Sequence, residues 1–385
     1  MHAVILAAGE GTRLRPLTRT RPKPMLPVAN RPILEYVVEA AADAGLEDVV
    51  LVVGYKRERI QNHFGDGDDW GVNISYAVQG KQLGTGHAVQ QAAPLVDDTF
   101  VVLNGDRIID SDIVSAVADQ STPAPAVAVS RSDNPSAYGV VELDGNRVTS
   151  VTEKPPAHAT TSDLINAGVY KFTSEVFEVL RSIETVGELP VTAALEQLAA
   201  DGEVHAVRHG GRWLDVSEPW DLLSMNAQIL DENGSRFEET AVVHDGATVA
   251  GPVDVASTVH IHPNATVLAG TSLGDNAEIG ANVVISNSVV LPDSTVAPGT
   301  VLRDCIVGSN ATVGPNCTVE GGLTTVALAG ELYESVRLGA LVGDNTEIGG
   351  AVTFAPGTVV GNGAHVHQGA TIDGTIEDDA TVWRG

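Results

Sequence analysis

Glycine and basic side chains are concentrated near the start of the chain. Residues 6–16 read Leu-Ala-Ala-Gly-Glu-Gly-Thr-Arg-Leu-Arg-Pro, and residues 22–28 read Pro-Lys-Pro-Met-Leu-Pro-Val. Five of the 22 Lys and Arg fall between Arg13 and Lys23, in a chain whose net charge is -28. Glycine lets a backbone approach a ligand closely, and guanidinium and ammonium groups neutralise phosphate oxygens. These residue types at this spacing predict a site for a nucleoside triphosphate.

Two common phosphate motifs do not fit this segment. A dinucleotide fingerprint needs a third glycine where this chain has Leu14, and a P-loop needs Gly-Lys followed by Ser or Thr. What remains is a strand, a glycine turn with Arg13, and a second segment in which prolines stiffen the chain around Lys23. The alternative interpretation is a tight turn that carries surface arginines.

Two aspartates are candidates for a metal site. Asp106 follows a buried strand, and Asp215 stands in Trp-Leu-Asp-Val. Open α/β sheets bind ligands at the carboxyl ends of their strands, and carboxylate oxygens suit Mg²⁺. We therefore expect Asp106 and Asp215 to share one Mg²⁺ with phosphate oxygens. A single aspartate at a strand end is more typical of a turn or a helix cap.

Composition limits the class of partner. Acidic residues are spread along the chain, as on the surface of halophilic proteins, and no basic stripe suits nucleic acid. No apolar run of about 18 residues predicts a membrane span, and the start lacks the basic segment of a signal peptide. Cys305 and Cys317 lack metal-ligand spacing. We expect a cytoplasmic protein without nucleic-acid or membrane partners.

Residues 1–235 alternate strand-like and helical patterns, which predicts a Rossmann-like α/β domain with a mixed, mostly parallel sheet. Strands are expected at 4–8, 49–53 and 100–103. A helix is expected along 33–41, ended by Gly45, and a hairpin over 142–151.

Residues 240–385 follow a six-residue rule. Aliphatic residues recur at Val243, Val249, Val255, Ile261, Val267, Leu273, Ile279, Ile285 and Leu291. The pattern resumes at Val301, Val307, Val313 and Val319, is interrupted over 320–337, and resumes from Val342 to Ile372. This spacing predicts a left-handed parallel β-helix of hexapeptide repeats with Gly-Asp-Asn corners. A β-sandwich, the alternative, would alternate with a period of two.

The glycine turn with Arg13 and the Lys23 segment together resemble the signature of the sugar-1-phosphate nucleotidylyltransferases, including proteins similar to glucose-1-phosphate thymidylyltransferase. Residues 82–88, Gln-Leu-Gly-Thr-Gly-His-Ala, are most similar to the base-reading segment of the N-acetylglucosamine-1-phosphate uridylyltransferases. A glycine N-terminus for a helix is the alternative there. Three further stretches, 138–141, 153–155 and 166–170, resemble the sugar-phosphate pocket of the family.

The resemblance implies a set of site residues. Those implied to bind the nucleotide are Ala8, Gly9, Gly11, Thr12, Gln79, Gly84 and Thr85. Those implied to bind the sugar phosphate are Gly139, Glu153, Lys154 and Asn166.

The implied reaction needs no protein nucleophile, because the sugar-phosphate oxygen can attack the α-phosphorus directly and expel pyrophosphate. Arg13 would hold pyrophosphate and Lys23 the α-phosphate, whereas Glu10, Arg15, Arg19 and Arg21 are expected nearer the rim. The expected substrates are UTP, then dTTP, with N-acetylglucosamine 1-phosphate or glucose 1-phosphate; GTP stays open. A non-catalytic regulatory paralogue would be expected to lose Arg13, Lys23 or Asp106.

The second domain resembles the acetyltransferase half of bifunctional relatives. Where they carry a histidine base, this chain has Ala-Pro-Gly-Thr-Val-Leu at 297–302. The pairs His260 with His262 and His365 with His367 are other candidates, since residues two apart share one face of a strand. We expect the β-helix to form a homotrimer, or a multiple of one, rather than to transfer acetyl groups.

Overall fold

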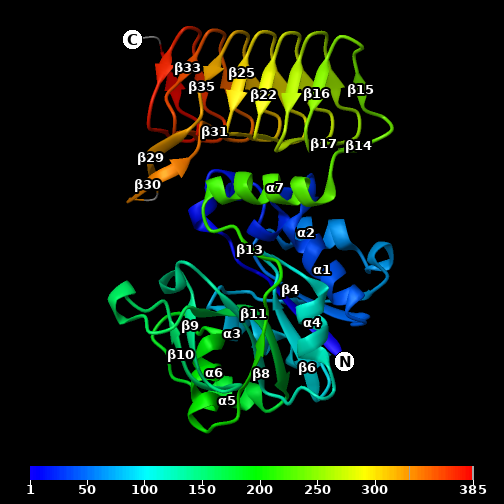
Figure 1. Ribbon diagram of the computed structural model, residues 1–385, viewed down its shortest axis with the longest axis vertical. Coiled ribbons are helices and arrows are strands. Elements are labelled where there is room, and N and C mark those ends of the chain that lie inside the picture. The colour runs from blue at the N-terminus through cyan, green and yellow to red at the C-terminus, as the bar shows by residue number, and fades with distance from the viewer. Residues whose placement is uncertain (329, 384–385) are drawn as a thin grey trace. The chain divides into compact units, whose positions relative to one another are not determined.

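The computed structural model describes residues 1–328 and 330–383. By internal contacts these residues form two units, shown with their elements in Figure 1. The first unit comprises Met1–Glu10, Pro22–Met25 and Ile33–Asp215, and the second comprises Gly11–Arg21, Leu26–Pro32 and Val216–Gly385. Two short early segments are therefore grouped with the C-terminal part of the chain. No described helix has both the length and the apolar character that crossing a membrane requires.

A nine-stranded mixed sheet forms the centre of the first unit. Its order is β5 (Asn73–Val78), β4 (Asp48–Val53), β1 (His2–Ala7), β6 (Thr99–Asn104), β11 (Leu164–Thr173), β8 (Ala126–Arg131), β12 (His205–Arg208), β10 (Arg147–Glu153), β9 (Gly139–Asp144). The first four strands are parallel, as are β8 and β12, whereas the remaining neighbours are antiparallel. The predicted strands at 4–8, 49–53 and 100–103 and the β9–β10 hairpin are confirmed.

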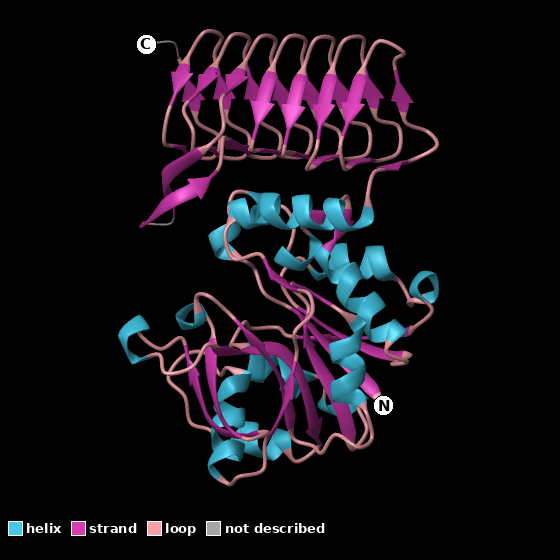
Figure 2. Cartoon of the chain, viewed as in Figure 1, coloured by secondary structure: helices cyan, strands magenta, loops and turns pink. Residues whose placement is uncertain are grey.

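Helices cover both faces of this sheet (Figure 2). One apolar cluster joins the sheet to α1 (Ile33–Asp43), α2 (Arg57–Phe64) and α4 (Ser111–Ala118). The opposite cluster joins it to α3 (Thr85–Gln91), α5 (Val176–Ser182) and α6 (Val191–Ala200). Each strand of the sheet's centre is buried on both sides, which explains its continuous Val, Ile and Leu composition. Because the strand centres are buried, polar residues lie at the strand ends.

A short ribbon brings distant residues to one strand end. β7 (Arg107–Ile109) pairs antiparallel with β13 (Trp213–Asp215), and the register places Asp215 opposite Arg107. β1 and β6 are parallel neighbours, and the Gly105 N–H donates to the carbonyl of Leu6 at 2.9 Å. The carboxyl ends of β1 and β6 therefore lie together with Asp215.

The second unit contains a β-helix of three parallel sheets, which we call its first, second and third faces. The first face consists of β14 (Arg236–Phe237), β17 (Val253–Val255), β20 (Thr271–Leu273), β23 (Val289–Val290), β26 (Cys305–Val307), β31 (Ala340–Val342), β34 (Thr358–Val360), β37 (Thr375–Ile376). The second face consists of β15 (Val242–Val243), β18 (His260–Ile261), β21 (Glu278–Ile279), β24 (Thr295–Val296), β27 (Thr312–Val313), β32 (Glu347–Ile348), β35 (His365–Val366), β38 (Thr381–Val382). The third face consists of β16 (Thr248–Ala250), β19 (Thr266–Leu268), β22 (Val284–Ser286), β25 (Val301–Arg303), β28 (Thr318–Val319), β33 (Thr353–Phe354), β36 (Thr371–Ile372).

The same unit holds α7 (Pro219–Asn233), the two-stranded pair β2 (Pro27–Val28) and β3 (Arg31–Pro32), and a hairpin of β29 (Leu323–Leu328) and β30 (Glu331–Arg337). The hairpin accounts for the predicted interruption at 320–337. The predicted corners are confirmed at Asn276 and Asn345, which adopt left-handed conformations with φ of 59° and 57°.

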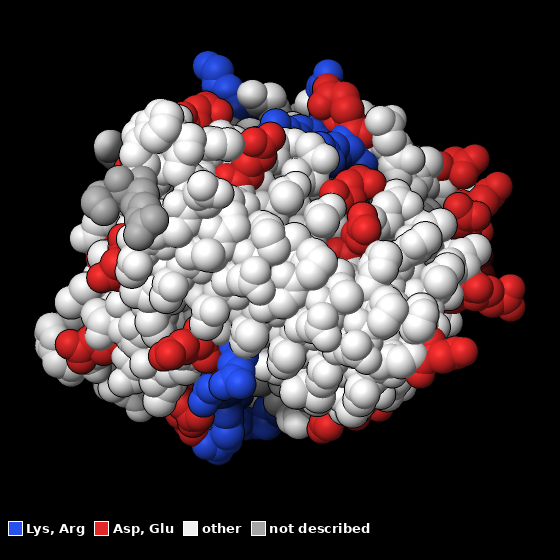
Figure 3. All heavy atoms as spheres, turned by 90° about the horizontal axis from the view of Figure 1, so that it is seen from above, with Lys and Arg blue, Asp and Glu red and all other residues white. Residues whose placement is uncertain are grey.

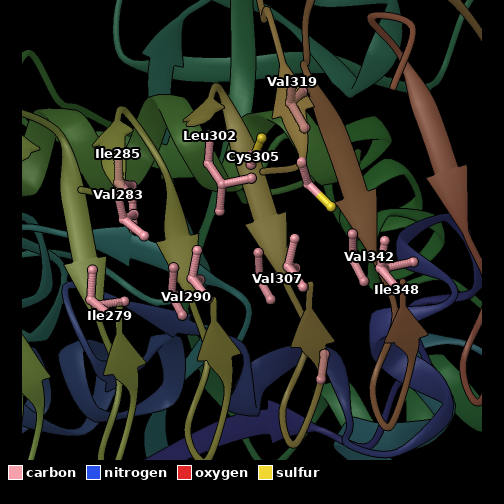
Figure 4. Packing of buried hydrophobic residues seen from close by; sticks show 14 of the residues in the cluster. Ile279, Val283, Ile285, Val290, Leu302, Cys305, Val307, Val319, Val342 and Ile348 are labelled. Carbon is pink, nitrogen blue, oxygen red and sulfur yellow. The ribbon is translucent and has the colours of Figure 1, made fainter. Parts of the chain in front are cut away.

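Inward-facing, mostly aliphatic residues from every coil fill the β-helix, and several coils contribute residues from the turns as well as from the strands (Figure 4). Two predicted positions are wrong, because the six-residue pattern loses one residue between Ile285 and Val290 and another between Leu302 and Val307. Val290, not Leu291, pairs with Leu273 and lies in the core cluster. Leu302, not Val301, points inward, with an exposed fraction of 2%. A coil that is one residue shorter shifts the inward-facing positions of every later coil by one residue.

The register makes a matched pair of substitutions informative. Leu302→Ala should lower the free energy of unfolding by about 2–5 kcal/mol because it leaves a cavity in the β-helix. Val301→Ala, at a half-buried outward position, should change it by less than about 1 kcal/mol. Urea denaturation of the two variants measures the difference, and equal effects would contradict the register.

Candidate functional site

An ammonium group joins the two predicted metal ligands. Lys23, at the start of a short 3-10 turn, donates to Asp106 Oδ2 at 2.6 Å and to Asp215 Oδ1 at 3.3 Å. The side chain of Lys23 is 11% exposed, and those of Asp106 and Asp215 are 34% and 6% exposed. The structure thus brings together three residues that sequence analysis selected separately.

Charge pairing sets the protonation of this cluster. Burial acts to lower the pKa of Lys23, but Asp106 and Asp215 outweigh it, so that its pKa lies above the usual 10.5. Burial acts to raise the pKa of Asp106, but Lys23 and Arg107 outweigh it, so that its pKa lies below the usual 3.8. At neutral pH the cluster therefore holds the charged ammonium of Lys23 beside the charged carboxylate of Asp106.

Arg107 is the residue of this cluster that sequence analysis missed. Its Nε lies 4.0 Å from Asp215 Oδ1, and its Nη1 donates to the backbone carbonyl of Asn166 at 3.3 Å. The guanidinium also stands over the rings of Trp213 and Tyr138, at 5.0 and 5.7 Å from their centroids. The signal was available in the sequence, because an arginine directly follows Asp106 in a chain with few basic residues.

The oxygen ligands of this strand end fit a Mg²⁺ ion. Asp106 and Asp215 supply two carboxylates, and the buried amide oxygen of Asn104 accepts no hydrogen bond from the described residues. Within residues 1–328 and 330–383, no group of three or more His, Cys, Asp or Glu could hold a metal. A hard cation held by two carboxylates would take its other ligands from substrate oxygens and water.

The predicted sugar-phosphate residues converge around Gly139. A Cβ built on Gly139 would lie 3.1 Å from Glu153 Oε2 and 3.6 Å from the Cβ of Asn166. Glu153 accepts a hydrogen bond from the Thr192 hydroxyl at 3.0 Å. Asn166 is buried and donates to the Tyr170 hydroxyl at 2.6 Å. The strand pairing of β9, β10 and β11 therefore brings Glu153 and Asn166 close to Gly139, where a side chain would crowd Glu153 Oε2.

Lys154 directly follows Glu153 in a left-handed conformation with φ of 43°. Its backbone N–H donates to the carbonyl of Tyr138 at 3.0 Å, and its side chain is exposed. An exposed ammonium next to Glu153 suits an anionic ligand group.

The predicted base-reading residues hold a helix N-terminus. Gly84 precedes α3 with φ of 95°, and a Cβ there would lie 2.5 Å from the Leu189 carbonyl. The buried amide of Gln79 donates to the Gly84 carbonyl at 3.0 Å, and Thr85 Oγ1 accepts from the Val191 N–H at 2.9 Å. The alternative interpretation, a glycine N-terminus for a helix, thus describes the local structure. These contacts fix the segment's shape.

The glycine turn is divided between the two units. Ala8 is buried after β1, and its carbonyl accepts from Gln82 Nε2 at 3.1 Å; the exposed Gly9 follows it in the first unit. Gly11, Thr12 and Arg13 belong to the second unit. Gly11 has φ of 72° and precedes the 3-10 turn Thr12–Leu14.

Arg13 is half exposed and lies 3.3 Å from Glu218 Oε1, which also accepts from the Tyr333 hydroxyl at 3.2 Å. Arg21 corrects the sequence analysis, because it is 7% exposed and lies in a buried ion pair rather than at a rim.

The histidine pairs of the β-helix are surface residues. His262 contacts Glu278 and His365 contacts Glu347, at 3.3 and 3.0 Å. His367 stacks on Trp383 with ring centroids 3.7 Å apart. β18 and β35 lie on the same face but four strands separate them, so the two pairs do not form one site.

The chain matches the nucleotidyl transferase family over residues 2–232 and the GMPPB C-terminal domain over residues 249–338. It is 36% identical to the bifunctional protein GlmU of Methanococcus maripaludis strain C5, over 100% of this chain and 97% of that protein. It is 39% identical to the low-salt glycan biosynthesis nucleotidyltransferase Agl11 of Haloferax volcanii, over 66% of this chain and 73% of that protein.

A glucose-1-phosphate thymidylyltransferase of Streptomyces antibioticus is 37% identical, over 72% of this chain and 80% of that protein. Among solved structures, a Bacillus anthracis protein assigned as a glucose-1-phosphate thymidylyltransferase superposes with a TM-score of 0.56 at 26% identity. That superposition covers 61% of this chain and 98% of the other.

The Lys23 cluster has a defined pH signature. Lys23→Met should lower the free energy of unfolding by about 2 kcal/mol at pH 7, less than for a fully buried pair because Asp106 is partly exposed. The raised pKa of Lys23 contributes stability below pH 10.5 that is lost as pH rises through the folded-state value. The lowered pKa of Asp106 contributes stability above pH 3.8 that is lost as pH falls through its folded-state value.

Urea unfolding at several pH values should show the largest difference in unfolding free energy between wild type and Lys23→Met near neutral pH. The difference should become smaller as pH falls through the folded-state pKa of Asp106 or rises through that of Lys23. Lys81→Met, which removes an exposed lysine, is the matched control and should change little. A Lys23→Met effect that is constant with pH would disprove the ion-pair account.

Proposed function

From the premise that this chain belongs to the nucleotidyl transferase family and is a sugar-1-phosphate nucleotidyltransferase, we propose that it joins UTP, or in second place dTTP, to a sugar 1-phosphate. The proposed sugar phosphate is N-acetylglucosamine 1-phosphate or glucose 1-phosphate, and the leaving group is pyrophosphate. The observation that carries the proposal is the ammonium of Lys23 held between Asp106 and Asp215.

In the proposed reaction the protein neutralises and orients two anions. An oxygen of the sugar 1-phosphate attacks the α-phosphorus, the new P–O bond forms, and the bond to pyrophosphate breaks. We assign Lys23 to the α-phosphate, Arg13 to the pyrophosphate, and Asp106 with Asp215 to Mg²⁺. When bound, Mg²⁺ supplies charge neutralisation at the phosphate oxygens.

We assign substrate recognition to the two sets of residues that the resemblance implies. Glu153 and Asn166 would hold sugar hydroxyls, Gly139 would leave room for the ring, and Lys154 would pair with the sugar phosphate. The nucleotide is assigned to Ala8, Gly9, Gly11, Thr12, Gln79, Gly84 and Thr85. Arg13, Lys23 and Asp106 are all kept, which supports catalysis over a regulatory paralogue.

Pyrophosphate release tests the function directly. The protein is incubated with Mg²⁺ and each of five nucleoside triphosphates, against glucose 1-phosphate, N-acetylglucosamine 1-phosphate and related sugar phosphates. Release that depends on both substrates, greatest with UTP, supports the proposal. Greatest release with dTTP or GTP reassigns the base, and no release with any pair overturns the function.

A second candidate function is acetyl transfer by the β-helix, favoured by the full-length similarity to relatives named bifunctional protein GlmU. Because residues 297–302 lack a histidine, we expect no thiol release from acetyl-CoA with glucosamine 1-phosphate. Thiol release that His262→Ala or His367→Ala abolishes would establish the second activity.

We also propose that the β-helix domain, residues 240–385, assembles the protein as a trimer or a multiple of one. One face of the molecule is largely neutral in a chain of net charge -28 (Figure 3). The first turn from the second to the third face contains Asp245, but the six later turns, at 262–264, 280–282, 297–299, 314–316, 349–351 and 367–369, contain no Asp, Glu, Lys or Arg. A neutral surface can be buried between subunits without desolvating charge. The mass in solution measures the assembly.

Removing either phosphate-binding cation should slow turnover. Arg13→Ala and Lys23→Ala are each expected to reduce kcat by about a hundredfold, on the order of 3 kcal/mol, because each loses a charge-assisted contact to phosphate. Steady-state pyrophosphate release measures the effect, and circular dichroism checks the fold. A folded variant with near-normal turnover would refute the assignment of its residue.

The metal assignment predicts a distinct behaviour for Asp106→Asn. Activity should be lost at ordinary Mg²⁺ and partly restored by excess Mg²⁺, because one charged ligand is replaced by a neutral oxygen donor. Asp215→Asn should behave similarly but more mildly. Titration of activity with Mg²⁺ is the measurement, and a wild-type enzyme that needs no divalent cation would rule out the two-carboxylate site.

A further inference from the structure

Four successive coils of the β-helix present a ladder of polar residues at one corner. The corner joins the first face to the second, and its residues are Ser309, Asp344, Asn362 and Asp378. The N–H of Ser309 donates to Asp344 Oδ1 at 2.7 Å, that of Asp344 to Asn362 Oδ1 at 2.7 Å, and that of Asn362 to Asp378 Oδ1 at 2.9 Å. The four residues therefore occupy equivalent positions, and we call them the corner ladder.

Every member of the corner ladder also contacts residues 16–21. Asp344 Oδ2 accepts from Arg21 Nη2 at 2.7 Å and from the Thr20 hydroxyl. Ser309 Oγ accepts from Arg21 Nη2 at 3.1 Å.

The other two members hold the earlier part of the same segment. Asn362 Nδ2 donates to the Pro16 carbonyl at 2.9 Å, and Asp378 lies 2.5 Å from Arg19 Nε. Residues from four coils thus hold one six-residue segment.

The central contact is a buried ion pair. The side chains of Arg21 and Asp344 are 9% and 3% exposed. A charged pair removed from water is stable only when both partners stay in register, because either charge alone would carry the full desolvation cost. The geometry of residues 20 and 21 is therefore fixed by the β-helix.

The segment held in this way leads directly to the proposed phosphate-binding residues. Thr12–Leu14 and Leu17–Arg19 are single 3-10 turns, and Thr18 Oγ1 donates to the Gly11 carbonyl at 2.7 Å. Such short turns have little stability of their own. The position of Arg13 thus depends on the contacts that residues 16–21 make with the corner ladder.

Earlier coils show that the corner itself does not require these contacts. Asp275 occupies the equivalent position three coils before Asp344, and its carboxylate accepts from the Ser257 N–H at 3.0 Å. Its contact is within the β-helix, as expected for a corner residue with only a structural role. Only the coils that carry the corner ladder use this position to contact residues 16–21, among the described contacts of Asp275 and the ladder.

We propose that the corner ladder is a positioning surface for nucleotidyl transfer, in which Asp344 and Asp378 hold the segment of Arg13 in its working conformation. The inference rests on the proposed function and deepens it, since the β-helix then contributes to catalysis without touching substrate. Asp344 and Asp378 are positioning residues.

The test compares Asp344→Asn with Asp275→Asn in the full-length protein. Each removes one carboxylate charge from the same corner position. Asp344→Asn should reduce kcat for pyrophosphate release by about tenfold or more and leave the KM for the sugar 1-phosphate unchanged, because a small displacement of a phosphate-binding group is costly. Asp275→Asn should retain wild-type kinetics.

A double-mutant cycle separates positioning from general destabilisation. If Asp344 acts through Arg13, Arg13→Ala with Asp344→Asn should be no slower than Arg13→Ala alone. Hydrogen exchange of residues 11–21 should be faster in Asp344→Asn than in Asp275→Asn. Where Asp344→Asn does not fold, Asp378→Asn replaces it, because the Arg19–Asp378 pair is more exposed.

Each other outcome overturns the inference in a recognisable way. An active wild type with Asp344→Asn equal to Asp275→Asn refutes the positioning role and leaves the proposed function intact. A double variant much slower than Arg13→Ala shows that Asp344 acts elsewhere. A wild type inactive with every substrate pair removes the proposed function and this role with it.

Discussion

The ammonium of Lys23 is the interaction on which the candidate catalytic cluster depends. Two carboxylates that share a small volume repel each other, and one of them would normally take up a proton. Lys23 contacts both Asp106 and Asp215, and Arg107 adds a second cation beside them. These cations lower the pKa of Asp106 and keep its carboxylate charged at neutral pH, the state in which a carboxylate can bind the proposed Mg²⁺. The cluster lies at the carboxyl ends of β1 and β6, and the ammonium of Lys23 offsets the charge of the carboxylates there.

Pairing with carboxylates also describes the arginines of the basic segment, residues 13–21. In a chain of net charge -28, three arginines of this segment pair with acidic side chains. Arg13 contacts Glu218, Arg19 contacts Asp378 and Arg21 contacts Asp344. In the proposed reaction, a polyphosphate would have to compete with Glu218 for Arg13. The half-exposed Arg13 has the weaker pairing that such an exchange needs, whereas the buried Arg21 is fixed in place.

Much of the architecture could be predicted because it depends on local periodicity. Strand composition and the six-residue repeat are properties of neighbouring residues, and both predicted the correct elements. The register at Leu302 could not be read from spacing, because a one-residue deletion leaves aliphatic residues at adjacent positions, 301 and 302. The roles of Arg107 and Arg21 were missed for a different reason. Their partners, Asp215 and Asp344, lie far away in sequence.

The corner ladder shows how a repetitive scaffold can acquire a specific contact surface. A β-helix places one turn residue of each coil at the same corner, so side chains from separate coils line up at the spacing of hydrogen-bonded strands. Ser309, Asp344, Asn362 and Asp378 contact residues 16–21, whereas the carboxylate of Asp275, at the same position of an earlier coil, contacts the Ser257 N–H within the β-helix. Few substitutions at one corner can therefore build a surface that fits a single segment, while the buried aliphatic pattern that forms the β-helix stays unchanged. The conformation of residues 16–21 then depends on residues as distant in sequence as Asp344, 323 positions from Arg21, and a local sequence signature alone does not determine it.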